Sequence, residues 1–340
     1  MYYNVIVLSW NTIRRGGDNM KKIQAIFLVF IIVILAAGCS KGKDQKTSIP
    51  DKIIIQAPVA PPTSPLVKMV EDKMLGDNVE FILYQNVEEA TTRVARGEAD
   101  FTVLPVNVAS KLYNKEADVS LLNVNTWGIL YLLSRNGEVK SWEDLRGKEL
   151  FVGAQGASPD VITRYLLSQN GIGEEEITIS YGTSPEMLQW TIAGKADIVV
   201  LPEPLVTQCL LKAENMEISM DYSQEWEKIN GKGSRLPQTG IVVRTSFAKE
   251  YPDIVEDFQN AYKTALETVV SDPKAVSGLI EEKLEIPAAV FENSMTRTKL
   301  EFATAEDAKT DVEAYLKALN ELSAEMIGGK LPDEGFYYKK

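Results

Sequence analysis

The stretch GEADFTVLP at positions 97–105 returns almost unchanged as GKADIVVLP at positions 194–202. Each copy has a glycine suited to end a helix, then an acid, a short apolar run and a proline. Short buried strands that alternate with helices are typical of parallel sheets covered on both faces. The two copies therefore predict two such sheets, one in each half of the chain.

The rest of the chain alternates in the same way. Strand-like runs occur at 52–57, 79–84, 99–104, 119–123, 128–134, 149–153, 177–181, 196–201, 216–220 and 240–244. Helical patterns lie between most of them, residues 223–235 form a polar segment, and only helices are expected from position 252 onward. We expect an α/β fold of two doubly wound lobes joined by two hinge segments. Lobe 1 comprises 51–127 plus 241–340, and lobe 2 comprises 128–240.

The N-terminal region has the pattern of a secretory signal. Met20, taken here as the start of translation, precedes two lysines and an apolar run over 23–37 that ends in Leu-Ala-Ala-Gly-Cys39. A run of about fifteen residues is short for a membrane span, which needs about 20. Its end resembles the bacterial lipobox, which predicts removal of 1–38, a palmitate-type lipid on Cys39 and a polar tether over 39–50. The alternative is a buried free cysteine at the end of a core helix.

Composition excludes several classes of function. The net charge is −12; residues 1–38 carry four basic side chains and one acid, a net +3, so the mature chain carries −15. Such an acidic surface argues against binding nucleic acid. The chain has no histidine, which removes Ser-His-Asp and Cys-His catalysis and histidine-built zinc sites. Beyond Cys39 the one cysteine is Cys209, so no intrachain disulfide is expected, and no cofactor, metal or catalytic residue is predicted.

Three further sequence motifs indicate a family resemblance: SWEDLRGK at 141–148, GAQGAS at 153–158 and LPEP at 201–204. With the lipobox and the repeated strand, they make residues 51–330 resemble a solute-binding lipoprotein of an ABC importer with the type II periplasmic-binding fold. The most similar branch includes binders of thiamine precursors, alkanesulfonates and nitrate. The resemblance implies two hinged lobes that close on a small solute and then dock on a membrane permease.

In open α/β sheets, ligands bind outside the carboxyl ends of the strands. The predicted ligand-binding residues at those ends are Thr63, Ser64, Gln85, Asn107, Thr126, Trp127, Gln155, Ala157, Ser158, Thr183, Glu203 and Thr239. Several of them open helices, where free amides suit an anion, and the alternative is that they act only as N-caps.

Two of these residues have sharper alternatives. Glu203, between two prolines, is expected either to pair with an amine or protonated ring nitrogen or to be a first-turn acid favoured by the helix dipole. Trp127 stacks on a flat ligand or packs at the hinge. No Arg or Lys falls in the segments at strand ends that are predicted to line the binding site. A pyrimidine-like solute is therefore favoured over sulfonate or nitrate.

The expected function is that of a monomeric, lipid-anchored solute-binding protein on the extracytoplasmic face of the bacterial cell membrane. Its partners would be the solute, an ABC permease and its ATPase. A ligand-sensing or scaffold lipoprotein of the same fold is the main alternative. An enzyme is a weaker one, because the pyrimidine synthase of the wider fold family depends on histidines that this chain lacks.

Overall fold

The computed structural model describes residues 50–340. The predicted signal peptide, Cys39 and the tether up to residue 49 lie outside the described residues. Among the residues described, no helix is both long and apolar enough to cross a bilayer.

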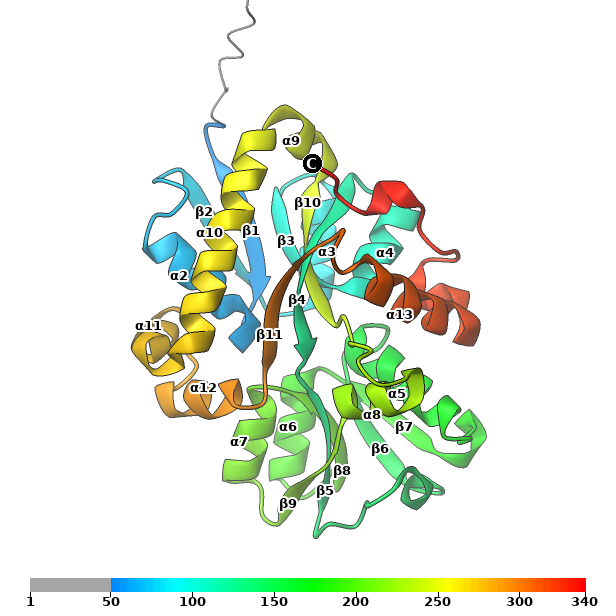
Figure 1. Ribbon diagram of the computed structural model, residues 1–340. Coiled ribbons are helices and arrows are strands. Elements are labelled where there is room, and N and C mark those ends of the chain that lie inside the picture. The colour runs from blue at the N-terminus through cyan, green and yellow to red at the C-terminus, as the bar shows by residue number, and fades with distance from the viewer. Residues whose placement is uncertain (1–49) are drawn as a thin grey trace, which may run out of the picture. The chain divides into compact units, whose positions relative to one another are not determined.

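The first sheet has six strands in the order β11-β4-β10-β3-β1-β2 (Figure 1). Strands β1, β2 and β3 are parallel, whereas β10 runs antiparallel to both β3 and β4, and β11 antiparallel to β4. The bounds are β1 Ile53–Pro58, β2 Val79–Tyr84, β3 Phe101–Pro105, β4 Val119–Gly128, β10 Thr239–Arg244 and β11 Lys299–Thr304. Its helices are α2 (Ser64–Glu71), α3 (Val87–Ala95), α4 (Val106–Asn114), α9 (Thr245–Glu250), α10 (Pro252–Ser271), α11 (Pro273–Leu284), α12 (Ala288–Met295) and α13 (Lys309–Leu322). We call this assembly lobe 1.

The second sheet has five strands in the order β7-β6-β8-β5-β9. Strands β6, β7 and β8 are parallel, and β5 runs antiparallel to both β8 and β9. The bounds are β5 Leu130–Arg135, β6 Glu149–Gly153, β7 Thr178–Gly182, β8 Ile198–Pro202 and β9 Met216–Asp221. Its helices are α5 (Ser158–Gln169), α6 (Ser184–Ile192), α7 (Leu205–Lys212) and α8 (Tyr222–Asn230), and we call this assembly lobe 2.

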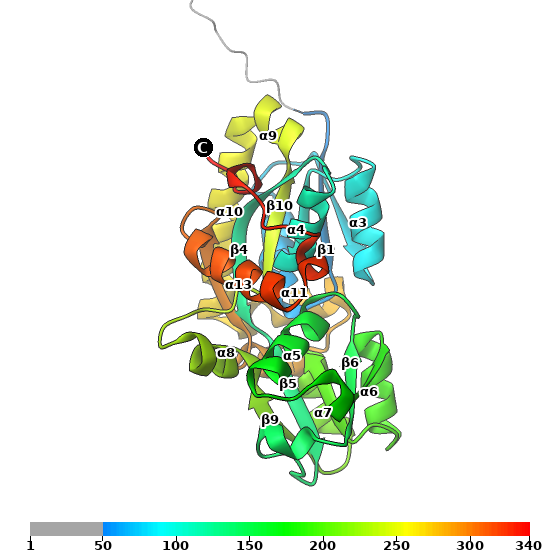
Figure 2. The ribbon, with the colours of Figure 1, turned by 90° about the vertical axis from the view of Figure 1, so that its right-hand side faces the viewer.

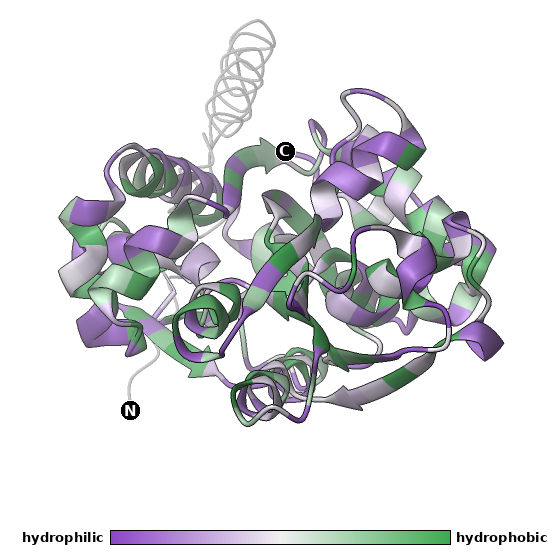
Figure 3. Cartoon of the chain, turned by 90° about the horizontal axis from the view of Figure 1, so that it is seen from below, coloured by the Kyte–Doolittle hydropathy of each residue, from purple (hydrophilic) through white to green (hydrophobic). Residues whose placement is uncertain are grey.

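Short 3-10 helices occupy Pro61–Thr63, Trp142–Leu145, Glu174–Glu176, Ala324–Ile327 and Glu334–Phe336. Seen from below, apolar strands fill the middle of the described region and hydrophilic faces of helices lie around it (Figure 3). This is the burial expected of sheets that helices cover. The predicted α/β fold with two sheets is therefore confirmed.

The repeated sequence forms the same local structure twice. Gly97 and Gly194 both take a left-handed φ of +68°, directly after α3 and α6, and each is followed by a strand whose first four residues are buried. Asp100 then pairs with Arg244 at 2.5 Å, and Asp197 pairs with Arg135 at 2.6 Å. In both copies the arginine lies on the antiparallel neighbour of the repeated strand.

The chain crosses between the lobes twice, between β4 and β5 and again between α8 and β10. Strand β4 ends at Gly128 and β10 begins at Thr239. The predicted lobe boundaries at 127/128 and 240/241 fall just inside the ends of these two strands and stay predictions.

One expectation about a single element was wrong, and a segment described only as polar contains a helix. The region after position 252 is not only helical, because β11 extends the first sheet along β4. Its two buried residues, Leu300 and Ala303, are three positions apart, so the strand shows no period-two pattern in the sequence. The polar segment 223–235 contains most of α8, which Asp221 caps and which buries Tyr222 and Trp226. Two aromatic residues one helical turn apart are a weak helix signal among so many polar ones.

Candidate functional site

Gln238, in the second crossing, lies at the junction of the two lobes. Its amide N donates to Thr126 O at 3.0 Å, and its side-chain oxygen accepts from Ile129 N at 2.8 Å. Its carbonyl accepts from Val106 N at 3.1 Å, at the start of α4, and from Ser158 Oγ at 3.2 Å, at the start of α5. One residue thus joins a helix start of each lobe to both crossings, and we call this arrangement the Gln238 junction.

Helix α4 of lobe 1 also holds the loop before α5 of lobe 2. Asn107 Nδ2 and Lys111 Nζ donate to the same oxygen, Gly156 O, at 3.0 and 3.1 Å. Gly156 has a φ of +77°, which favours glycine, and its own N–H donates to Asp160 Oδ2 at 2.7 Å. Burial lowers the pKa of Lys111, and the nearby carboxylate of Asp160 partly opposes that effect.

Beside this contact, α5 of lobe 2 packs against α13 of lobe 1 (Figure 2). Aromatic rings of α5, α8 and α13 meet there. The ring of Trp226 lies 5.1 Å from that of Tyr165 and 5.7 Å from that of Tyr315. Trp226 and Tyr315 are both almost completely buried, in a hydrophobic cluster that includes residues of both lobes. We call this contact the aromatic seam.

A second, charged contact links α7 of lobe 2 to the segment after α12 of lobe 1. Arg297 Nε lies 2.6 Å from Glu203 Oε1, and Arg297 Nη2 donates to Thr207 Oγ1 at 2.6 Å. Tyr131 Oη donates to the Arg297 carbonyl at 2.6 Å. Helix α12 packs against α7 nearby, and we call this contact the charged seam.

Glu203 is fully buried in the charged seam. Its Oε1 is paired with Arg297 and its Oε2 accepts from Thr207 N at 3.0 Å. Burial raises the pKa of Glu203, although the Thr207 amide and Arg297 act in the opposite direction. Both carboxylate oxygens are therefore already engaged within the protein.

Trp127 is packed under an arginine. The Arg235 guanidinium lies 3.7 Å from the centre of the indole ring, and Trp127 Nε1 donates to Glu301 O at 2.8 Å. Arg235 also pairs with Glu301 and Asp311. The indole ring is thus covered by Arg235 in this structure, and whether Trp127 also contacts a ligand stays a prediction.

The predicted site residues fall into three groups. Asn107, Thr126, Ala157 and Ser158 meet at or beside the Gln238 junction, which Thr239 follows directly in the chain. Thr63, Ser64, Trp127 and Glu203 are buried and bonded within the protein. Gln85, Gln155 and Thr183 are exposed, and they follow β2, β6 and β7.

The hydroxyl residues predicted at helix starts do not all act as N-caps. Thr183 caps α6 with its side chain, which accepts from Glu186 N. In contrast, Thr63 Oγ1 donates to Pro58 O, Ser64 Oγ to Pro61 O, and Ser158 Oγ to Gln238 O. The hydroxyl of Ser158 therefore bonds across the lobes instead of capping its own helix.

Sequence reasoning missed two cations. Lys111 lies one helical turn after Asn107, so the helical spacing alone could have placed it beside that residue. Arg297 lies 94 residues from its partner Glu203, in a region where only helices were expected, and no local pattern indicates it. No Arg or Lys falls among the segments at strand ends that were predicted to line the site. In the folded protein, however, Lys111 contacts Gly156 and Arg297 contacts Glu203.

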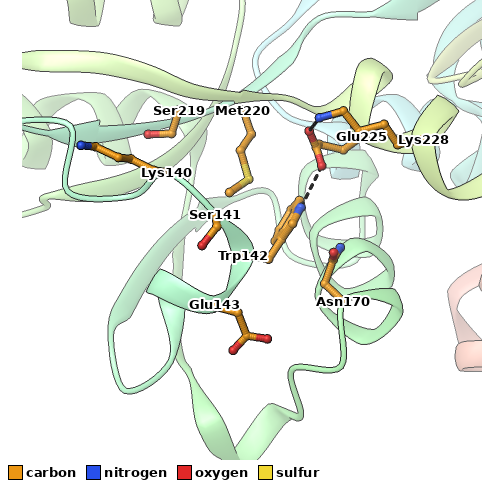
Figure 4. A pocket seen from close by; sticks show the side chains of 9 residues that line it. All are labelled: Lys140, Ser141, Trp142, Glu143, Asn170, Ser219, Met220, Glu225 and Lys228. Atoms are coloured by element: carbon orange, nitrogen blue, oxygen red, sulfur yellow. Dashed lines mark hydrogen bonds and ion pairs between the residues drawn. The ribbon is translucent and has the colours of Figure 1, made fainter.

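A groove of about 380 Å³ lies on lobe 2, away from these residues (Figure 4). It is lined by Lys140, Ser141, Trp142, Glu143, Asn170, Ser219, Met220, Glu225 and Lys228. Trp142 Nε1 and Lys228 Nζ already bond to the Glu225 carboxylate, at 2.9 and 2.5 Å. Because these three polar groups pair with one another and the groove contains no predicted site residue, we do not assign the solute to it.

Several solved structures are similar to this chain. An ABC transporter protein from Parabacteroides distasonis is 25% identical with a TM-score of 0.70, and covers 86% of this chain and 100% of its own. The periplasmic aliphatic sulphonate binding protein SsuA from Escherichia coli is 14% identical with a TM-score of 0.68, covering 86% and 93%. The alkanesulfonate-binding protein SsuA from Xanthomonas axonopodis pv. citri, solved with MOPS, is 14% identical with a TM-score of 0.65, covering 85% and 97%.

These structures share the periplasmic-binding fold with this chain. Among curated proteins, none matches it significantly. The family model described as NMT1/THI5 like matches residues 75–276, which is more than half of the sequence. The chain therefore belongs to the NMT1/THI5-like family.

Proposed function

We propose that this protein is a lipid-anchored, extracytoplasmic solute-binding protein that captures a small organic molecule between its lobes and delivers it to an ABC importer. The observation that carries the proposal is the Gln238 junction, where helix starts of both lobes and both crossings meet in hydrogen bonds. A ligand held there would contact both lobes, so its binding would be coupled to their closure. The similarity to an ABC transporter protein and to two sulfonate-binding proteins supports the same assignment.

In this proposal the predicted residues have different roles. Asn107, Thr126 and Ser158 contact the solute at the junction. The exposed Gln85 and Thr183 form the outer rim, because they follow β2 and β7, the edge strands of the two sheets. Glu203 acts through Arg297 on closure instead of pairing with the solute.

The first solute candidate is pyrimidine-like, with sulfonates and nitrate as the alternatives. A thermal-shift screen of the purified protein against pyrimidines, sulfonates, nitrate and polyamines tests the assignment. At least one class should raise the melting temperature, and the compound should be recovered unchanged. Failure of every class, or turnover of a bound compound, would contradict solute binding without chemistry.

Lipid anchoring is tested separately. Cys39→Ala should release the protein from the membrane into the medium or periplasm, whereas the control Cys209→Ala should stay anchored, because Cys209 is buried in the core of lobe 2. Retention of the Cys39→Ala protein in the membrane fraction would rule out the lipid anchor.

The sensing alternative differs only in its partners. Deleting the cognate permease should abolish uptake of the solute found in the screen, whereas a sensor would leave uptake intact. Adjacent permease and ATPase genes would favour import.

A further inference from the structure

Two amide groups at the Gln238 junction are buried without a hydrogen-bond partner on one of their polar atoms. Asn107 Oδ1 lacks a donor and Gln238 Nε2 lacks an acceptor, although the two residues are 0% and 1% exposed. Unpaired buried polar atoms are uncommon in folded proteins, and each calls for an explanation.

The orientation of both amides is fixed by their other atoms. Asn107 Nδ2 donates to Gly156 O at 3.0 Å and, more weakly, to Met326 O at 3.4 Å, so its oxygen has to point elsewhere. Gln238 Oε1 accepts from Ile129 N at 2.8 Å, which fixes its NH2 group in the same way. Turning either amide over would bring like groups together, so the unpaired atoms are one acceptor and one donor.

Asn107 and Gln238 both lie at the Gln238 junction. Val106 N, in the residue before Asn107, donates to Gln238 O at 3.1 Å. Both residues also contact the loop that opens α5, Asn107 through Gly156 and Gln238 through Ser158. Separation of the lobes would break the contacts with that loop and expose the junction to a solute.

We propose that the solute supplies the missing partners, donating a hydrogen bond to Asn107 Oδ1 and accepting one from Gln238 Nε2. This inference rests on the proposed function and names its substrate class: a neutral molecule with a donor and an acceptor on one edge, as in a carboxamide or an aminopyrimidine. An anion offers no donor to Asn107 Oδ1, and the charge of Lys111 nearby is opposed by Asp160 in the first turn of α5.

The closed lobes without solute then carry two unsatisfied groups, which disfavours closure until a matching solute arrives. A solute that pairs with only one of the two groups favours closure less than a solute that pairs with both. Selectivity between neutral and anionic compounds thus follows from which atoms are left unpaired, and not from the net charge of the protein.

The test compares binding of neutral probes (cytosine, uracil and nicotinamide) with that of methanesulfonate and nitrate by calorimetry. At least one neutral probe should bind ten-fold or more tightly than either anion. Gln238→Glu keeps the acceptor for Ile129 N but replaces the unpaired donor, and it should weaken that probe at least ten-fold. The control Gln189→Glu makes the same change on an exposed residue of α6 and should leave the affinity unchanged.

If Gln238→Glu fails to fold, the probe series decides alone, with N,N-dimethylnicotinamide as the compound that lacks the donor and should bind at least ten-fold more weakly than nicotinamide. Tighter binding of an anion, or equal affinity of the Gln238→Glu protein, would overturn this inference while leaving solute capture intact. If no probe binds, the inference is also overturned, and the uptake measurement decides the proposed function on its own.

Discussion

The two seams between the lobes are held by different kinds of contact, one by aromatic packing and the other by a buried ion pair. The aromatic seam joins α5 and α8 to α13 through Tyr165, Trp226 and Tyr315. The charged seam joins α7 to the segment after α12 through one buried carboxylate and one arginine. Apolar packing is non-directional and tolerates small rotations, whereas an ion pair depends on its geometry.

In the proposed function the lobes open and close, and this difference between the seams bears on how they would do so. The aromatic seam is continuous with the core of both lobes, so it can stay packed while the lobes rotate about it. The charged seam can break and re-form as a unit, because its contacts converge on the Arg297 guanidinium and the Glu203 carboxylate. We infer that opening separates the charged seam first.

The largest expected effect is loss of stability at the aromatic seam. Trp226→Ala removes a side chain that is 1% exposed and contacts rings of both lobes, so it should lower the free energy of unfolding by about 3–5 kcal/mol. Urea unfolding of the variant and of Trp190→Ala, which changes a tryptophan 39% exposed, measures this difference. Equal effects of the two substitutions would contradict the assignment of Trp226 to a structural seam.

The charged seam should respond asymmetrically. Arg297→Met leaves the carboxylate of Glu203 buried and unpaired and should cost roughly 3 kcal/mol, whereas Glu203→Gln leaves an arginine that reaches solvent and should cost about 1 kcal/mol. Urea unfolding of both variants checks the order. A larger cost for Glu203→Gln would mean that the arginine, and not the carboxylate, is the group that burial penalises.

The same pair gives a pH dependence with a defined sign. Burial raises the pKa of Glu203, so the folded protein holds this proton more tightly than the unfolded chain. That contribution to stability is therefore greatest at low pH and is lost as the pH rises through the folded-state pKa. In Arg297→Met the pKa should rise further, and the stability deficit measured at pH about 8 should shrink at pH about 5. A deficit that grows on acidification would contradict a buried carboxylate.

The smallest expected effect is at the α4 contact. Lys111→Met removes one of two hydrogen bonds to Gly156 O but keeps the apolar stem, so the free energy of unfolding should change by less than about 1 kcal/mol. Because that bond exists only between the lobes, solute affinity should change more than stability does. Calorimetry beside urea unfolding separates the two, and a loss of stability without a loss of affinity would place Lys111 outside closure.

The repeated sequence predicted much of the fold, because its glycines and apolar runs each favour one local structure. Glycines 97 and 194 need a left-handed φ, and the buried runs that follow them form β3 and β8. The site was predicted only in outline. Asn107 and Ser158, both from segments at strand ends, lie at the Gln238 junction, and their part in binding stays a prediction.

The rest depends on contacts between residues far apart in the sequence. Arg297 lies 94 positions from its partner Glu203, in the short segment between α12 and β11, and no local pattern indicates that contact. The unpaired atoms of Asn107 and Gln238 depend on which oxygen and nitrogen the neighbouring backbone groups already occupy. A one-dimensional pattern contains no record of that.

The central claim is that two lobes close around a solute that they do not change. Small-angle X-ray scattering of the purified protein, with and without the compound found in the screen, measures closure most directly. The account predicts a smaller radius of gyration at saturating solute, and a smaller change in Arg297→Met because the charged seam no longer holds the lobes closed. An unchanged radius at saturation in the unmodified protein would contradict it.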